Sequence, residues 1–303
     1  MNAPVAEMDA PAAQPAPGPG WSQHVRGFAW APLVPLLIAL IALGAAVLIP
    51  NLYSDPNGLD PYSLRASGVA LGLLAVALAV PALARARLVL VSLVTITLSW
   101  SAFLGAAQLL ADAGVQQSGD QANFNASVAW FGVTAVVLGL LWLVMRRGHP
   151  RLRLAHLGWP AVAFGVGGTL LFFLVTLLIP AGVLGREGIV VPEVARDYIW
   201  LVPANMLQGA AQELQFRGLL LGSLERITSP AVANAGQAVV FGLAHLAIVY
   251  QGPLAPFVPL TMALGLLLGW MTQKTKSLWP AIVIHMVADV AVTFAVLPGL
   301  YGS

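Results

Sequence analysis

The sequence predicts an all-α, polytopic membrane protein with about nine transmembrane helices. Of its 303 residues 59% are hydrophobic and only 9% are charged, and the mean hydropathy is +0.85. An average soluble domain carries about 25% charged residues. The composition therefore excludes a soluble globular protein, a disordered chain and a nucleic-acid-binding domain. The chain contains no cysteine, which excludes disulfides, thiolate metal sites and a cysteine nucleophile.

Apolar runs of about 20 residues between polar breaks predict the individual helices. The weakest is the eighth, because Pro253, Pro256 and Pro259 crowd its start. Eight to nine spans fit the pattern. The predicted spans are 30–50, 66–84, 88–111, 127–145, 159–184, 197–222, 229–250, 254–273 and 277–298.

The charges in the breaks between these runs alternate in sign along the chain. Ten Lys and Arg residues fall on one side of the predicted membrane and three on the other. Cytoplasmic loops carry the excess of Lys and Arg, so we expect a cytoplasmic N-terminus, an external C-terminus and an integral location in a bacterial plasma membrane. The ten residues are Arg26, Arg85, Arg87, Arg146, Arg147, Arg151, Arg153, Arg226, Lys274 and Lys276.

The chain divides into three segments by composition. Residues 1–28 are rich in Ala and Pro and lack the pattern of a signal peptide, so we expect a disordered cytoplasmic tail. Residues 29–150 hold the four N-terminal helices, and 151–303 hold a five-helix core. The Arg-rich loop at 146–156 is the expected seam between the two groups of helices.

Ionisable side chains are concentrated in the five-helix core. Such groups are costly within a membrane, so each is a candidate for function. The candidates are Glu213, Arg217, His245, His285 and Asp289. We expect two histidines and two carboxylates on three neighbouring helices to share one site, although Arg217 is explained equally well as the i,i+4 ion-pair partner of Glu213.

Two of these helices also carry uncharged polar faces. In the sixth helix Asn205, Gln208, Gln212 and Gln215 fall on one face, and in the seventh a similar face leads to His245. Lipid cannot satisfy such faces, so we expect them to face one another or a water-filled cavity. The alternative is that the amides join helices as packing contacts. The Gly-rich stretches at 164–168 and 264–269 predict close helix packing and not nucleotide binding.

Three short patterns in the core resemble, in order, the motifs of the CPBP family, which includes the CAAX-processing membrane proteases and bacterial Abi proteins. The Glu-Glu-x-x-x-Arg motif corresponds to residues 212–217, the Phe-x-x-x-His motif to 241–245 and the His-x-x-x-Asn/Asp motif to 285–289. Each pattern lies on its own predicted helix. The resemblance covers roughly residues 159–298, and the first 150 residues add only membrane helices to it.

The resemblance implies hydrolysis of a peptide bond in or at the membrane. In the family, the first Glu of the pair acts as general base on a water held with the first His, and the last His with Asn or Asp stabilises the oxyanion. A carboxylate in an apolar cavity can take a proton from water, and imidazoles can donate to an oxyanion. On an older view Glu213, His245, His285 and Asp289 would hold zinc instead.

This chain departs from the motif at its first position, where Gln212 replaces Glu. An amide cannot accept a proton near neutral pH, so Gln212 cannot be the base. Glu213 points about 100° away and can substitute only if the helix is rotated or locally distorted. Asp289 takes the place of the commoner Asn, and its carboxylate can orient His285 or bind a metal.

Three functions are therefore compatible with the sequence. The first is an intramembrane endopeptidase with Glu213, His245, His285 and Asp289 as catalytic residues, supported by Gln212, Arg217 and Phe241. The second is a catalytically inactive relative that binds membrane proteins or lipidated peptides in the same cavity, and the third is a proton-coupled transporter. We expect no soluble cofactor, with zinc the one possible metal. The expected partners are a membrane-embedded or lipidated peptide and the bilayer, with no nucleic acid or nucleotide.

Overall fold

All regular structure in the described part of the chain is helical, which confirms the predicted fold class. The computed structural model describes residues 61–115, 119–145, 152–154, 157–178, 199–245 and 254–301. The expected tail at 1–28 and the expected span at 30–50 lie outside these residues. The count of nine spans therefore stays a prediction, whereas each of the other eight expected spans contains a helix.

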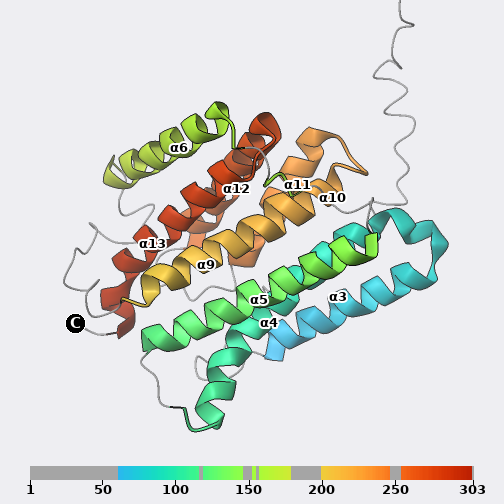
Figure 1. Cartoon of the computed structure of the whole chain (residues 1–303), viewed down its shortest axis with the longest axis horizontal. Coiled ribbons are helices and arrows are strands. Elements are labelled where there is room, and N and C mark those ends of the chain that lie inside the picture. The colour runs from blue at the N-terminus through green and yellow to red at the C-terminus, as the bar shows by residue number, and fades with distance from the viewer. Residues whose placement is uncertain are drawn as a thin grey trace, which may run out of the picture.

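The helices form a stack of elongated rods (Figure 1). From one side to the other the order is α6, α13, α9, α5, α4 and α3, and α11 and α12 pack on each other beside η2 and α13. The elements are α3 (Pro61–Ala79), η1 (Pro81–Ala86), α4 (Arg87–Asp112), α5 (Gly119–Met145), α6 (Trp159–Leu178), α9 (Leu201–Glu213), η2 (Leu214–Leu220), α10 (Leu221–Leu224), α11 (Pro230–Ala244), α12 (Leu254–Thr275) and α13 (Trp279–Tyr301).

Three predicted boundaries of α3 and α5 were wrong by five or more residues. The span expected at 66–84 is α3, which begins at Pro61 and ends at Ala79, and a 3-10 turn connects it to α4. Pro81 explains the break, because it lacks a backbone N–H and forces Val80 into an extended conformation. Helix α5 begins at Gly119, eight residues before its expected start, because its polar first turns are part of the helix.

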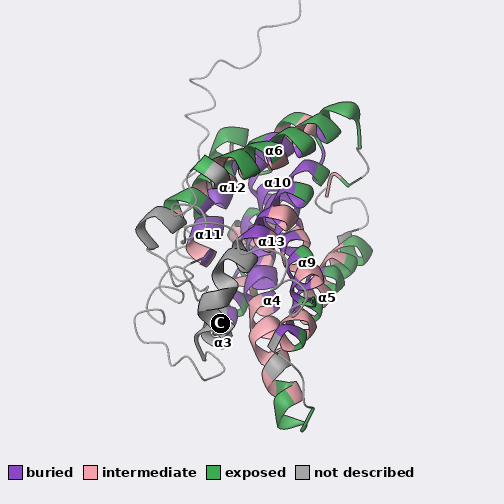
Figure 2. Ribbon diagram, turned by 90° about the vertical axis from the view of Figure 1, so that its left-hand side faces the viewer, coloured by how far each residue is buried: buried purple, intermediate pink, exposed green. Residues whose placement is uncertain are grey.

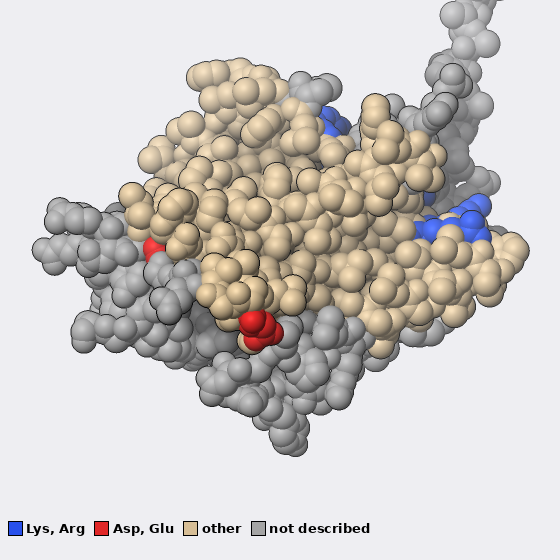
Figure 3. Space-filling model, turned by 60° about the horizontal axis from the view of Figure 1, so that its bottom comes forward, with Lys and Arg blue, Asp and Glu red and all other residues tan. Residues whose placement is uncertain are grey.

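The outer surface of the stack is that of a membrane protein. Helix α6 exposes large apolar side chains along its length, with Trp159 at 80% and Leu178 at 72% exposure (Figure 2). By length and composition, Pro81–Asp112 and Asp120–Val144 are long and apolar enough to cross a bilayer, counting only the residues described. Figure 3 shows a broad uncharged face, with Lys and Arg side chains towards one end. This distribution fits helices whose ends lie at the two membrane surfaces.

Glycines bring the helices of the core into close contact, as the Gly-rich stretches predicted. A Cβ on Gly269 of α12 would lie 1.9 Å from the Asn234 side chain of α11, and one on Gly265 would lie 3.1 Å from Ala238. A Cβ on Gly168 of α6 would lie 2.3 Å from Ile284 of α13. Small residues let helix backbones approach closely where no hydrophobic force between helices exists.

The N-terminal helices are part of the same apolar core as the C-terminal ones. Helix α4 contributes Leu90 and Leu93 to a buried cluster that also contains Phe216 and Leu220 of η2 and Phe241 of α11. Helix α4 therefore supports the elements on which the candidate residues lie.

Candidate active site

The winding of the sixth predicted helix changes next to the candidate residues. Helix α9 is regular to Glu213, and the next seven residues, Leu214–Leu220, form a π-helix before α10 continues to Leu224. The sequence interpretation required such a distortion for Glu213 to enter the site. Short π-helical segments within α-helices occur frequently at functional sites.

Glu213 lies at the centre of a buried polar cluster. Its Oε1 accepts a hydrogen bond from Nη1 of Arg217 at 2.5 Å and lies 2.6 Å from Nδ1 of His285. The other ring nitrogen of His285, Nε2, lies 3.3 Å from Oδ1 of Asp289. The imidazole of His285 thus has a carboxylate oxygen at each nitrogen, and an N–H on either nitrogen has an acceptor. The i,i+4 ion pair of Glu213 and Arg217 is formed as expected.

The ring of Phe241 contacts residues of all three motifs. Its ring centroid lies 4.4 Å from that of His245, 5.4 Å from that of His285 and 5.1 Å from that of Phe216. The guanidinium carbon of Arg217 lies 4.1 Å from the same ring, a distance at which cations are attracted to aromatic faces. One buried phenyl ring therefore joins η2, α11 and α13.

His245 is held by the carbonyl group of its own helix. Its Nδ1 lies 2.7 Å from the backbone oxygen of Phe241. A carbonyl oxygen only accepts, so Nδ1 carries the proton, and in the neutral ring Nε2 carries the lone pair. The different depths predicted for His245 and His285 do not keep them apart, because both rings contact Phe241.

Gly209 allows α9 to lie directly on α13. A Cβ at this position would be 3.0 Å from both the backbone nitrogen and the Cα of Met286. Gly209 lies one helical turn before Glu213, and Met286 directly follows His285, so this contact sets the distance between those two side chains. The sequence analysis missed Gly209. A glycine four residues before an intramembrane carboxylate was the signal that could have identified it.

The expectation that the amide face of α9 looks into a shared cavity was wrong for two of its four residues, Gln208 and Gln215. Nε2 of Gln208 donates to Asn123 and Ser127 of α5, and Nε2 of Gln215 donates to Thr134 of the same helix. The partners were not recognised because α5 is apolar apart from a few hydroxyl and amide groups.

Two polar residues of α11 likewise form hydrogen bonds to a neighbouring helix, in this case α12. Asn234 donates to the carbonyl oxygen of Leu266, and Gln237 donates to that of Gly265. Gln208, Gln215, Asn234 and Gln237 thus act as packing contacts, which was the alternative interpretation.

Several atoms of the charged cluster have no hydrogen-bond partner among the described residues. They are Oε2 of Glu213, Nε and Nη2 of Arg217 and Oδ2 of Asp289, all buried. Buried polar atoms are normally paired, so such a concentration points to bound water or substrate. Gln212 is buried as well, but within the described residues its amide forms no side-chain hydrogen bond.

The cluster as arranged does not fit a zinc ion. The described residues contain no group of three or more His, Asp or Glu side chains placed to hold a metal. The guanidinium of Arg217 already lies on Oε1 of Glu213, so a dication there would face a fixed positive charge. The chemistry proposed for the site uses water and protein groups alone.

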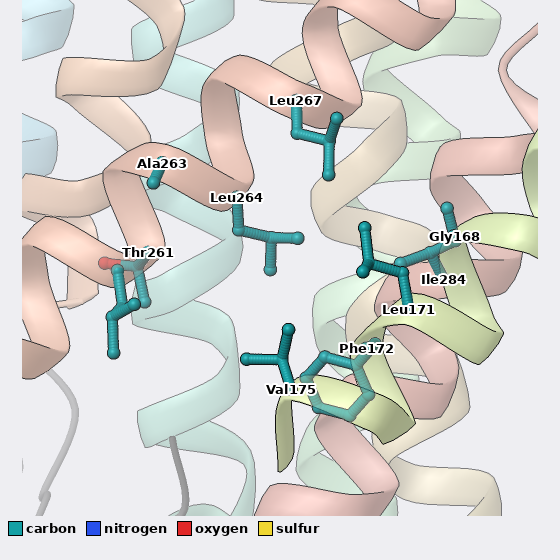
Figure 4. Close-up of a pocket in the computed structure, with 10 residues that line it drawn as sticks. Gly168, Leu171, Phe172, Val175, Thr261, Ala263, Leu264, Leu267 and Ile284 are labelled. Carbon is teal, nitrogen blue, oxygen red and sulfur yellow. The ribbon is translucent and has the colours of Figure 1, made fainter. Parts of the chain in front are cut away.

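A separate apolar pocket of about 290 Å³ lies between α6, α12 and α13. In Figure 4, Leu171, Phe172 and Val175 of α6 lie opposite Leu264 and Leu267 of α12. Among the described residues of the lining, Thr261 is the one with a polar side-chain group. The pocket also includes Ile284, the residue before His285, so α13 contributes to both the pocket and the charged cluster.

Comparison with protein families supports the resemblance seen in the sequence. Residues 195–291 match a family described as type II CAAX prenyl endopeptidase Rce1-like. This segment contains all three motifs and every residue of the cluster around Phe241. No curated protein and no solved structure showed a significant match. Residues 195–291 are therefore similar to the CAAX-processing proteases of the CPBP family, and two described helices, Pro81–Asp112 and Asp120–Val144, are long and apolar enough to cross a membrane.

Proposed function

We propose that the protein is an intramembrane endopeptidase that hydrolyses a peptide bond of a membrane-associated, lipidated substrate. The observation that supports this most is that His245 and His285 both contact the ring of Phe241, while Glu213 and Asp289 lie at the two ring nitrogens of His285. Two imidazoles and two carboxylates provide the groups needed to hold a water molecule, accept its proton and stabilise the charge on the attacked carbonyl.

The residues have distinct roles in this proposal. His245 presents Nε2, the nitrogen that carries a lone pair, and so accepts a hydrogen bond from the attacking water. His285 is fixed between two carboxylates, and Arg217 compensates the charge of Glu213 within the apolar core. The unpartnered atoms around these groups supply hydrogen bonds for the water and the peptide.

The apolar pocket supports the lipidated class of substrate. Its lining of Leu, Val, Phe and Ile side chains suits a hydrocarbon chain, and it lies beside the segment of α13 that carries His285. In this proposal the lipid chain occupies the pocket while the peptide reaches the charged cluster. Replacing Ala263 with Trp fills the pocket and is expected to slow cleavage of the lipidated form of a substrate more than that of its lipid-free form.

The decisive experiment compares new protein termini in membranes of matched cells with equal amounts of three versions of the chain. These are the unmodified protein, His245→Ala and Gln212→Glu. Termini present with the unmodified protein and missing with His245→Ala establish proteolysis and identify a substrate. Termini that form only with Gln212→Glu would mean that the site is dormant in the natural chain. If no version produces new termini, the binding and transport hypotheses replace the protease.

A further inference from the structure

The proton acceptor of this site must be a group other than Gln212. An amide takes no proton near neutral pH. In the proposed function Nε2 of His245 holds the attacking water, so the groups compared as final proton acceptors are the carboxylates of Glu213 and Asp289. The two carboxylates differ in how deeply they are buried and in the hydrogen bonds that they accept.

Glu213 is poorly suited to take a proton from water. Its side chain is fully buried, and Oε1 already engages both the guanidinium of Arg217 and Nδ1 of His285. An oxygen that already accepts a charge-assisted hydrogen bond and lies beside an imidazole nitrogen has little room left to receive a proton from water. Neutralising Glu213 would also leave Arg217 charged and uncompensated in the core, which is costly.

Asp289 has the properties that Glu213 lacks. Its side chain is 23% exposed, against 0% for that of Glu213, and no Lys or Arg in the described residues forms an ion pair with it. Its Oδ1 makes one long contact of 3.3 Å with Nε2 of His285, whereas Oε1 of Glu213 has two close partners at 2.5 and 2.6 Å. The second oxygen of each carboxylate is without a partner among the described residues.

We infer that Asp289 is the general base of this protein and that Glu213 positions His285. The inference rests on the proposed function. Asp289 takes one proton from a water molecule while the water oxygen bonds to the carbonyl carbon of the scissile peptide. The C–N bond then breaks, and the proton passes from Asp289 to the leaving nitrogen. The products are a carboxylic acid and an amine, and Asp289 is again a carboxylate.

The substitution Asp289→Asn tests this role directly. Asn has nearly the same size, stays within hydrogen-bond reach of His285 and can donate to an oxyanion, but it cannot accept a proton. If Asp289 only orients His285 or stabilises the oxyanion, the Asn variant remains active. If Asp289 is the base, cleavage falls by roughly 100-fold or more.

The experiment uses full-length protein in isolated membranes. The substrate is the one identified by termini that require the unmodified chain and are missing with His245→Ala. The variants are Asp289→Asn, Asp289→Glu and the double variant Gln212→Glu/Asp289→Asn. We expect the first to lose cleavage, the second to retain part of it because the carboxylate is kept, and the third to recover activity through a carboxylate at position 212.

Failure of this inference is distinguishable from failure of the proposed function. Cleavage by Asp289→Asn within about tenfold of the unmodified rate overturns the role of Asp289 and leaves the protease intact. Loss of cleavage in both Asp289→Asn and Asp289→Glu, with lowered thermal stability, also overturns it, because the residue would then be structural. Termini that form only with Gln212→Glu exclude Asp289 as the base of the natural chain. If no version of the chain produces termini, both proposals fall.

Discussion

Two faces of one helical segment, α9 with η2, show the difference between polar groups that pack and polar groups that do chemistry. On one face Gln208 and Gln215 donate to neutral side chains of α5. On the other Glu213 and Arg217 form a fully buried ion pair shared with His285. The amide face connects two helices, whereas the charged face also leaves several atoms available for water or substrate.

The difference between these two faces shows that polar residues in a membrane helix do not by themselves mark an active site. Amides inside a membrane can be satisfied by a neighbouring helix at little cost. A buried charge that is only partly compensated remains expensive, so it is retained where it serves a function. Substitutions on the two faces should therefore have different effects. Those on the amide face should affect the stability of the fold alone, whereas those on the charged face should also affect cleavage.

The largest effect is expected from breaking the buried ion pair. Glu213→Ala leaves Arg217 uncompensated in the core, so we expect the free energy of unfolding to fall by about 3–5 kcal/mol. Denaturant titration of the protein in detergent micelles measures this. The matched control is Glu213→Leu/Arg217→Met, which removes both charges and should be more stable than the single variant. A double variant as unstable as Glu213→Ala would refute the coupling.

Separating α9 from α13 should have the next largest effect. Gly209→Ala places a Cβ 3.0 Å from the backbone of Met286, so the two helices must shift apart. We expect a loss of about 1–3 kcal/mol in stability and a clear loss of cleavage, because Glu213 moves away from His285. Gly167→Ala is the control, since nothing lies within 4 Å of its added Cβ. Equal effects of the two substitutions would show that the contact is unimportant.

A substitution on the amide face should have a smaller effect on stability and almost none on cleavage. Gln208→Leu removes the hydrogen bonds to Asn123 and Ser127. We expect stability to fall by about 1 kcal/mol, with cleavage unchanged in membranes that contain equal amounts of folded protein. Loss of cleavage at unchanged stability would mean that this face takes part in the chemistry and would remove the distinction between the two faces.

The smallest effect is expected at the ion pair of Arg153 and Glu225, near the end of α10. The nitrogen–oxygen distance is 2.6 Å, but the two side chains are 18% and 19% exposed. Partial exposure screens the charges, so Arg153→Ala should cost at most about 1 kcal/mol, and less at high salt. If Arg153→Ala lowered the free energy of unfolding as much as Glu213→Ala, burial would not explain the difference in strength between the two ion pairs.

The all-α fold, the positions of eight described helices and the set of charged candidate residues could all be predicted from the amino-acid sequence. These follow from local properties, since hydropathy and charge are read along the chain. The contacts of Phe241 with the three motifs, the spacing that Gly209 allows between Glu213 and His285, and the packing role of Gln208 became visible only in the folded chain. Helical periodicity shows which residues share a face, but the rotation and approach of neighbouring helices decide what that face contacts.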